Sequence, residues 1–193
     1  MKLNSKFWEE RYLKGEDKWN VGEISTPIKE YIDQITNKKI KILIPGAGNG
    51  YEFEYLIKNG FNNSFVVDYA TTPLENIKKR IPNLNENQVI NSDFFELEGN
   101  FDLIIEQTFF CALNPELRED YVRKMKSLLN PNGKIAGLLF QFPLTNEGPP
   151  FGGSEVEYIT LFQKNFNIVT METAYNSIVP RKNKELFVIF EKK

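Results

Sequence analysis

A glycine-rich loop, followed about twenty positions later by an acidic residue, is the first feature with chemical potential. Gly46, Gly48 and Gly50 stand in the string PGAGNG, directly after a short apolar run. Glycine lets the chain turn tightly and lets backbone N–H groups approach a ligand. Asp68 ends the next apolar run, where a carboxylate can accept both hydroxyls of a ribose. The pairing favours a nucleoside-cofactor site over a plain turn beside a helix cap.

Two more pairs of residues follow apolar runs. Asp93 and Phe94 come after a brief strand pattern. They suit an adenine amino group and its ring face, or equally a turn cap and a core phenylalanine. Glu106 and Gln107 end the run FDLIIEQ, at the rim of any cleft beyond the strand ends. For Glu106, a carboxylate that faces water is the alternative.

Histidine is missing from the sequence, and Cys111 is its one cysteine. Ser-His-Asp triads, Cys-His dyads and imidazole metal sites are thereby excluded, as are intramolecular disulfides and multi-thiolate metal sites. We expect no metal site, and we expect Cys111 to be buried and inert. The commonest general base is absent, so the expected reaction asks little of acid–base side chains.

The 193 residues predict one domain spanning 1–193. Twenty-four basic against 26 acidic residues predict no nucleic-acid partner, because such partners normally require a basic excess. The sequence holds no uncharged apolar stretch of about 18 residues, so we expect no membrane span or membrane partner. With one thiol and no export signal, the expected location is cytoplasmic. We expect a monomer.

Strand and helix patterns alternate after about residue 40. Short apolar runs predict strands over 40–45, 64–69, 87–90, 101–107 and 134–142. Helical spacing predicts helices over 27–36, 51–60, 72–80, from Pro115 onward after a loop, and over 154–165, with turn residues at 130–133. Strands alternating with helices indicate a parallel sheet. Strand patterns at 167–173 and 185–191, with no helix between them, predict an antiparallel hairpin at one edge.

The predicted fold is therefore α/β, a Rossmann-like, doubly wound three-layer sandwich. Its sheet is mostly parallel, with an antiparallel C-terminal hairpin. In such sheets the ligand lies beyond the C-terminal ends of the strands, at the point where the strand order reverses. The residues singled out above come from those ends.

At these residues the chain resembles the class I S-adenosylmethionine-dependent methyltransferases. More narrowly, it resembles the thiopurine methyltransferase family with its halide/thiol methyltransferase branch. The resemblance runs from Phe7 to Phe190. It includes the spacing of Trp8, Tyr12 and Trp19 and the strings ILIPGAGNG, VVDYA, SDFF, EQTFFCAL and GPPFGG.

The resemblance implies that S-adenosylmethionine is the cofactor and that a small-molecule methyl acceptor is the substrate. It implies that residues 1–36 form a helical cover, with Trp8, Tyr12 and Trp19 over the cofactor. From spacing alone, the favoured interpretation of Trp8, Tyr12 and Trp19 is a helix that packs on the sheet. The other cofactor-binding residues it implies are Gly46, Gly48 and Gly50 under the methionine part, Asp68 at the ribose, Asp93 and Phe94 at the adenine, and Glu106 and Gln107 beside the methionine part.

We expect a small, apolar acceptor pocket. The residues expected to line it are Trp19, Phe109, Phe110, Phe151 and Tyr175. Arg118 lies where relatives carry an arginine near the active centre, and either Arg118 or Arg181 would attract an anion. A surface ion pair is the alternative for Arg118. Two positions depart from the family: Tyr12 stands where many relatives have a second tryptophan, and Gln107 where halide-type relatives often have a tyrosine.

Methyl transfer suits this composition, because an in-line displacement depends mainly on alignment of donor and acceptor. A thiol, with an ordinary pKa of about 8.5, is partly ionised near neutrality and needs little help from a base. The prediction is therefore a methyltransferase that acts on a thiol, hydrosulfide or halide-like acceptor. Two alternatives stay open. One is a nicotinamide-dependent oxidoreductase, whose fingerprint requires a glycine where this chain has Tyr51. The other is a non-catalytic nucleotide-binding module.

Overall fold

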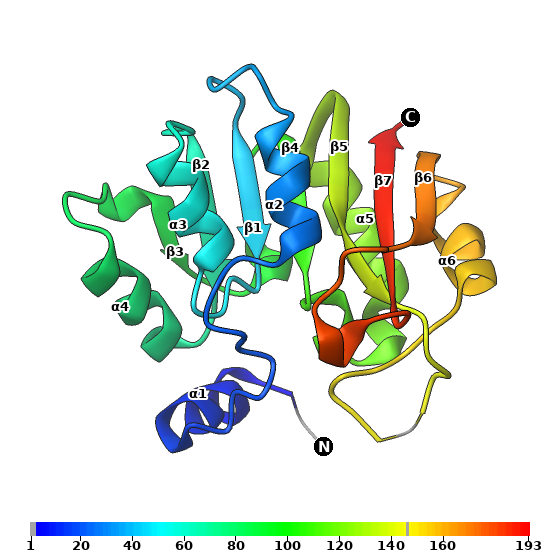
Figure 1. The fold of residues 1–193 in the computed structure, drawn as a ribbon, viewed down its shortest axis with the longest axis horizontal. Coiled ribbons are helices and arrows are strands. Elements are labelled where there is room, and N and C mark those ends of the chain that lie inside the picture. Colours follow the sequence, from blue (N-terminus) through cyan, green and yellow to red (C-terminus); the bar gives the residue numbers. More distant parts are fainter. Residues whose placement is uncertain (1–2, 146) are drawn as a thin grey trace.

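A seven-stranded sheet forms the centre of the protein, as seen in a computed structural model that describes residues 3–145 and 147–193 (Figure 1). The strand order is β3-β2-β1-β4-β5-β7-β6. Strands β3, β2, β1, β4 and β5 are parallel, and β7 runs antiparallel between β5 and β6. The strand bounds are β1 (Ile42–Pro45), β2 (Ser64–Asp68), β3 (Val89–Asn91), β4 (Phe101–Gln107), β5 (Leu129–Phe140), β6 (Phe166–Thr173) and β7 (Glu185–Lys192).

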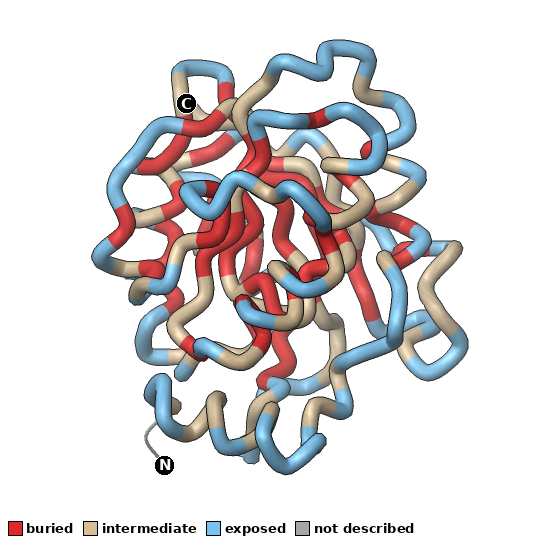
Figure 2. The backbone as a smooth tube through the Cα atoms, turned by 90° about the vertical axis from the view of Figure 1, so that its left-hand side faces the viewer, coloured by how far each residue is buried: buried red, intermediate tan, exposed pale blue. Residues whose placement is uncertain are grey.

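Helices cover both faces of this sheet, so the predicted three-layer arrangement is confirmed. The helices are α1 (Ser5–Lys14), α2 (Thr26–Asp33), α3 (Tyr51–Lys58), α4 (Thr71–Arg80), α5 (Arg118–Leu128) and α6 (Glu155–Phe162). On one face α2, α3 and α4 contribute Ile28, Phe53 and Ile77 to the core. On the other, α5 and α6 contribute Tyr121 and Phe162. Figure 2 shows the buried residues concentrated in the sheet and the inward sides of these helices.

Helix α1 lies apart from both layers, below the C-terminal ends of the parallel strands (Figure 1). None of its residues is buried. Asn4 caps its start by accepting from the Phe7 N–H at 3.0 Å. The Glu9 carboxylate reaches α4 and accepts from the N–H groups of Thr71 (2.7 Å) and Thr72 (3.0 Å). Because free N–H groups at a helix start favour an anion, Glu9 fastens α1 to α4.

Most predicted elements are confirmed, including the antiparallel C-terminal hairpin, but two regions differ. The turn expected at 130–133 lies inside β5, because Leu129 already pairs with Phe101 and the ladder resumes at Lys134 opposite Leu103. The intervening residues form an irregular bulge in which Asn132 has φ of 62°. The helix expected from Pro115 begins as a 3-10 turn and becomes α-helical only at Arg118.

Across residues 3–145 and 147–193, none of the helices has the length and apolar character required to cross a bilayer.

Gly137 in β5 provides a test of the packing between β5 and β4. A methyl group at this position would lie 2.2 Å from the backbone oxygen of Glu106. We therefore expect Gly137→Ala to lower the free energy of unfolding by about 1–3 kcal/mol, since overpacking forces the backbone to shift. Urea denaturation measures the change. The control is Val169→Ala on an exposed position of β6, where we expect a change within about 0.5 kcal/mol. Equal stability of the two variants would contradict the prediction.

Candidate active site

A cavity of about 760 Å³ lies between α1 and the C-terminal ends of the parallel strands. Its wall comes from residues within 3–23, the glycine loop, the ends of β2, β3 and β4, and loops after β4 and β5. Of the residues predicted for the site, the structure brings twelve to this cavity: Trp8, Tyr12, Trp19, Gly46, Gly48, Gly50, Asp68, Asp93, Phe94, Gln107, Phe109 and Arg181.

The glycine loop requires glycine at all three positions. Gly46, Gly48 and Gly50 have φ of 58°, 51° and 66°, in the left-handed region that other residues rarely adopt. A Cβ on Gly46 would also lie 2.1 Å from the Phe109 ring, and one on Gly50 would lie 2.4 Å from Ile77. The loop therefore lies directly against two side chains and leaves its backbone exposed to the cavity.

Asp68 ties the end of β2 to the glycine loop. One carboxylate oxygen accepts from the Gly48 N–H at 3.2 Å, and the other accepts from the Ala70 N–H at 2.9 Å. Burial raises the pKa of Asp68 to about 6, while these backbone bonds oppose the rise. At neutral pH the residue presents a carboxylate to the cavity, as ribose hydroxyls require.

Three aromatic side chains from the N-terminal segment form the wall opposite the glycine loop. Trp8 and Tyr12 each meet Trp19 edge to face, at centroid distances of 5.4 and 5.5 Å. The Tyr12 hydroxyl comes close to the glycine loop: its oxygen would lie 3.3 Å from a Cβ on Gly48, nearer than any other atom. Burial raises the pKa of Tyr12, so its hydroxyl stays neutral. Arg181, near the other end of the sequence, donates to the backbone oxygen of Trp19 at 2.9 Å and so helps to hold this wall in place.

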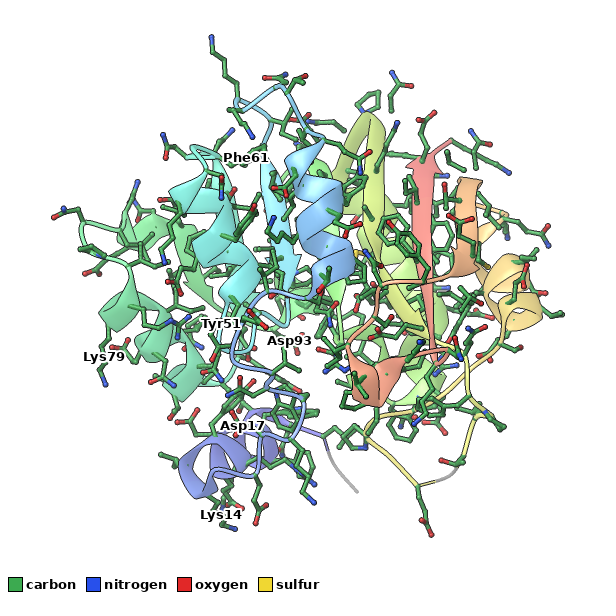
Figure 3. The ribbon with its side chains drawn as sticks, viewed as in Figure 1. Lys14, Asp17, Tyr51, Phe61, Lys79 and Asp93 are labelled. Atoms are coloured by element: carbon green, nitrogen blue, oxygen red, sulfur yellow. The ribbon has the colours of Figure 1, made fainter. Side chains whose placement is uncertain are left out.

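Asp93 and Phe94 have local structural roles and also line the cavity. Asp93 accepts from the Phe95 N–H at 2.9 Å and so caps the short helix that follows. Phe94 is buried, with its ring 5.1 Å from that of Phe109. Figure 3 shows Asp93 and Tyr51 at the end of the sheet that faces α1.

The structure places the Glu106 side chain outside the cavity, unlike the prediction. It is 1% exposed. One carboxylate oxygen accepts from the N–H groups of Phe109 (2.8 Å) and Phe110 (2.9 Å), and the other accepts from the Tyr121 hydroxyl (2.5 Å). The alternative of a carboxylate facing water is also wrong. The next residue, Gln107, does line the cavity and accepts from the Ser25 hydroxyl at 3.2 Å.

Of the seven residues predicted for the acceptor pocket, four are not among those lining the cavity: Phe110, Arg118, Phe151 and Tyr175. Arg118 is buried beside α6, where it donates to the Gly152 backbone oxygen at 2.7 Å and pairs with Glu157. Its guanidinium lies 4.7 Å from the centroid of Phe110, which is itself a core residue. Phe151 is buried and its N–H donates to the Cys111 oxygen at 2.7 Å. Tyr175, also expected there, is exposed and donates to Glu30 at 2.8 Å.

Sequence reasoning missed several residues of the wall. Phe140, Pro149 and Pro150 contribute apolar surface, and Cys111 lies among them with a pKa raised by burial. Glu52, in the first turn of α3, also lines the cavity. The prolines belong to the GPPFGG string already noted, but a glutamate in a helix gives no signal of burial because most lie on the surface.

The fold and site define a class, the Rossmann-like α/β proteins that bind a nucleoside cofactor beyond the carboxyl ends of the strands. Its features are a glycine loop after β1, an acid at the end of β2, and a cavity between β1 and β4, where the strand order reverses. The crystal structure of 1,6-didemethyltoxoflavin-N1-methyltransferase from Burkholderia thailandensis was solved with 1,6-didemethyltoxoflavin and S-adenosylhomocysteine bound. It matches this chain with a TM-score of 0.78 at 18% identity, covering 99% of this chain and 88% of that one.

The family model for thiopurine S-methyltransferase (TPMT) matches residues 3–193, and the chain belongs to this family. A probable thiol methyltransferase 2 from Arabidopsis thaliana is 29% identical over 186 residues, which cover 92% of this chain and 81% of that protein. Thiocyanate methyltransferase 1 from Brassica oleracea is 28% identical with the same coverage. The chain is therefore an S-adenosylmethionine-dependent methyltransferase, which displaces both the nicotinamide-dependent and the non-catalytic alternatives.

Glu106 makes the stability of the protein depend on pH. Burial raises its pKa from 4.5 to about 7, although its three hydrogen bonds oppose the rise. An acid that holds its proton more strongly when folded loses stability as pH rises. From about 4.5 to about 7 the unfolded chain has released this proton while the folded chain keeps it. We therefore expect the free energy of unfolding to fall across that window.

The test is urea denaturation of wild type and Glu106→Gln at several pH values. The amide keeps the shape of the protonated acid, so we expect a shallower decline with pH in the variant. Glu98→Gln, at an exposed position, should follow the wild-type profile. An unchanged pH profile in Glu106→Gln would refute the assignment.

Proposed function

We propose that the protein transfers the methyl group of S-adenosylmethionine to a thiol or another soft sulfur nucleophile. The observation that carries the proposal is the composition of the cavity beyond β4 and β5, which we call the acceptor end. Its residues are Phe109, Cys111, Phe140, Pro149, Pro150 and Arg181. This is an apolar surface with one cation, whose guanidinium lies 5.9 Å from the Phe140 ring centroid.

The residues of the other half fit the cofactor. Asp68 would hold the ribose hydroxyls, and Asp93 with Phe94 would hold the adenine. Gly46, Gly48 and Gly50 would pass under the methionine part, with Gln107 beside it. The three glycines hold left-handed backbone conformations, and a Cβ on Gly46 or Gly50 would overlap Phe109 or Ile77. Trp8, Tyr12 and Trp19 would cover the cofactor, since aromatic faces attract a sulfonium cation.

The bound cofactor supplies an electrophilic methyl group, and the protein supplies alignment and a dry, apolar surround. Arg181 would draw an anionic acceptor to the acceptor end. The apolar wall would leave that anion weakly solvated, which favours its attack on a cation because both charges diminish during transfer. Cys111 would stay a thiol spectator because burial raises its pKa. A thiol acceptor needs no strong base, which fits a chain without histidine.

Two relatives support a sulfur acceptor, since one is named a probable thiol methyltransferase and the other a thiocyanate methyltransferase.

We also propose how the protein is organised and where it works. The chain would form a single domain over 1–193. Residues 3–23 would be the cofactor cover, which is shorter than the expected 1–36 because α2 packs on the sheet. It would work as a cytoplasmic monomer on a small molecule, with neither nucleic acid nor membrane as a partner. The near balance of charge supports the last point.

Removing both adenosine-side carboxylates tests the cofactor residues. We expect the double variant Asp68→Ala/Asp93→Ala to lose detectable binding of S-adenosylhomocysteine in isothermal titration. Hydrogen bonds to a charged group contribute about 1.5–3 kcal/mol each, so Asp68→Ala alone should weaken binding at least about tenfold. Glu98→Ala, at an exposed position, is the control. Unchanged affinity in the double variant would contradict the assignment.

The acceptor is tested by S-adenosylhomocysteine production with hydrosulfide, thiophenol, a small aliphatic thiol, iodide and phenol. We expect turnover with at least one sulfur compound, and thiophenol faster than phenol, because phenol ionises far less at neutral pH. Arg181→Met should lower kcat/KM for hydrosulfide about tenfold, with Arg181→Lys less affected. Arg123→Met, on an exposed arginine of α5, is the control. Turnover of phenol alone would overturn the proposal.

A further inference from the structure

Glu52 is a buried acid that the proposed chemistry does not yet use. It is the second residue of α3, directly beyond the glycine loop, and it is 7% exposed. Its side chain lines the same cavity as Asp68 and Gln107. Acidic side chains are seldom buried unless they are paired, so this position calls for a partner.

The partners of Glu52 within the protein are few. One carboxylate oxygen accepts from the Ser25 N–H at 3.4 Å, which is a long hydrogen bond. By contrast, buried Glu106 accepts three shorter bonds, and buried Glu185 has Arg181 at 3.4 Å. None of the ion pairs of the described residues 3–145 and 147–193 includes Glu52. Burial raises the pKa of Glu52, although the N–H groups of Glu52 and Ser25 and the charge of Arg181 oppose the rise.

Ser25 links Glu52 to Gln107. Its N–H donates to Glu52, and its hydroxyl donates to the Gln107 side-chain oxygen at 3.2 Å. The three residues thus form one polar cluster where the start of α2, the start of α3 and the end of β4 meet. Asp68 and Asp93 lie on the other side of the glycine loop, at β2 and β3. The cluster therefore faces the methionine side of the cavity, away from the adenosine side.

S-adenosylmethionine carries two positive charges with different requirements. Its sulfonium has no N–H to donate and is satisfied by aromatic faces. Its α-ammonium, like that of lysine, donates up to three hydrogen bonds and requires acceptors. A buried carboxylate with one long bond has acceptor capacity to spare. A cation that arrives at such a group offsets part of the cost of its burial.

We infer that Glu52 holds the α-ammonium group of the cofactor's methionine part. Glu52 is then a positioning residue. By anchoring the far end of the methionine chain it fixes where the sulfonium, four bonds away from the ammonium nitrogen, points its methyl group. Ser25 bonds to both Glu52 and Gln107, so the cluster acts on the orientation of the methionine chain and does not contact the acceptor.

The test compares two ligands by isothermal titration: S-adenosylhomocysteine and its deamino analogue, in which hydrogen replaces the amino group. Wild type should bind S-adenosylhomocysteine at least tenfold more tightly than the analogue. In Glu52→Gln we expect this ratio to shrink to threefold or less, because affinity for S-adenosylhomocysteine falls and affinity for the analogue does not. Glu75→Gln, an exposed acid on α4 outside the cavity, should keep the wild-type ratio.

Thermal unfolding of the ligand-free variants separates a binding role from a structural one. Glu52→Gln removes an uncompensated buried charge, so its Tm should equal or exceed that of wild type. Equal weakening of both ligands, or unchanged affinity for both with slower turnover, would overturn the inference. If Glu52→Gln does not fold, the wild type alone still tests the inference. The inference would be overturned if wild type bound S-adenosylhomocysteine less than threefold more tightly than the deamino analogue. Failure of wild type to bind S-adenosylhomocysteine at all would instead refute the proposed cofactor site.

Discussion

The wall of the cavity after β4 depends on one buried carboxylate. Glu106 accepts the N–H groups of Phe109 and Phe110, and so closes a tight turn in which Thr108 takes a φ of 57°. The Tyr121 hydroxyl, from α5, occupies its second oxygen. A residue with a positive φ is held only where its surroundings over-determine it. Here two backbone donors and one phenol, all satisfied by the same acid, provide that restraint.

This turn fixes the position of Phe109. The Phe109 ring in turn leaves no room for a side chain on the glycine loop at Gly46. The ring stands where a Cβ of Gly46 would be, and it also contacts Phe94 at the adenine side. Gly137 completes the arrangement from β5, because only a residue without Cβ can lie against the Glu106 backbone. The wall is thus a chain of close contacts across β5, β4, β1 and the loop after β3, and its contacts at Gly46 and Gly137 each require a residue without Cβ.

The sequence predicted the sheet well because its strands are apolar runs separated by helical periodicity. It also located Asp68, Gln107 and the glycines, since chain order places them at strand ends. It could not show which way a side chain turns there. Glu106 and Gln107 are adjacent in a strand and therefore point to opposite faces. One enters the core and the other enters the cavity. The predictions for Arg118 and Phe151 were wrong for a related reason, because both residues are buried with partners within the protein, Gly152 for Arg118 and Cys111 for Phe151.

The two proposed halves of the cavity differ in the charge of the side chains that come from the strand ends and the loops beyond them. The acids Asp68, Asp93 and Glu52 stand around the half that suits a cofactor bearing two positive charges and a diol. The acceptor end has Arg181 instead, fixed to Trp19 of the aromatic wall and to Glu185. The acceptor end would thus favour an anionic nucleophile, and the acidic half of the cavity would favour the cationic methyl donor. Their mutual attraction would be strong in a wall this apolar, since little solvent screens it. A chain without histidine can promote methyl transfer in this way, because placement of charge replaces movement of a proton.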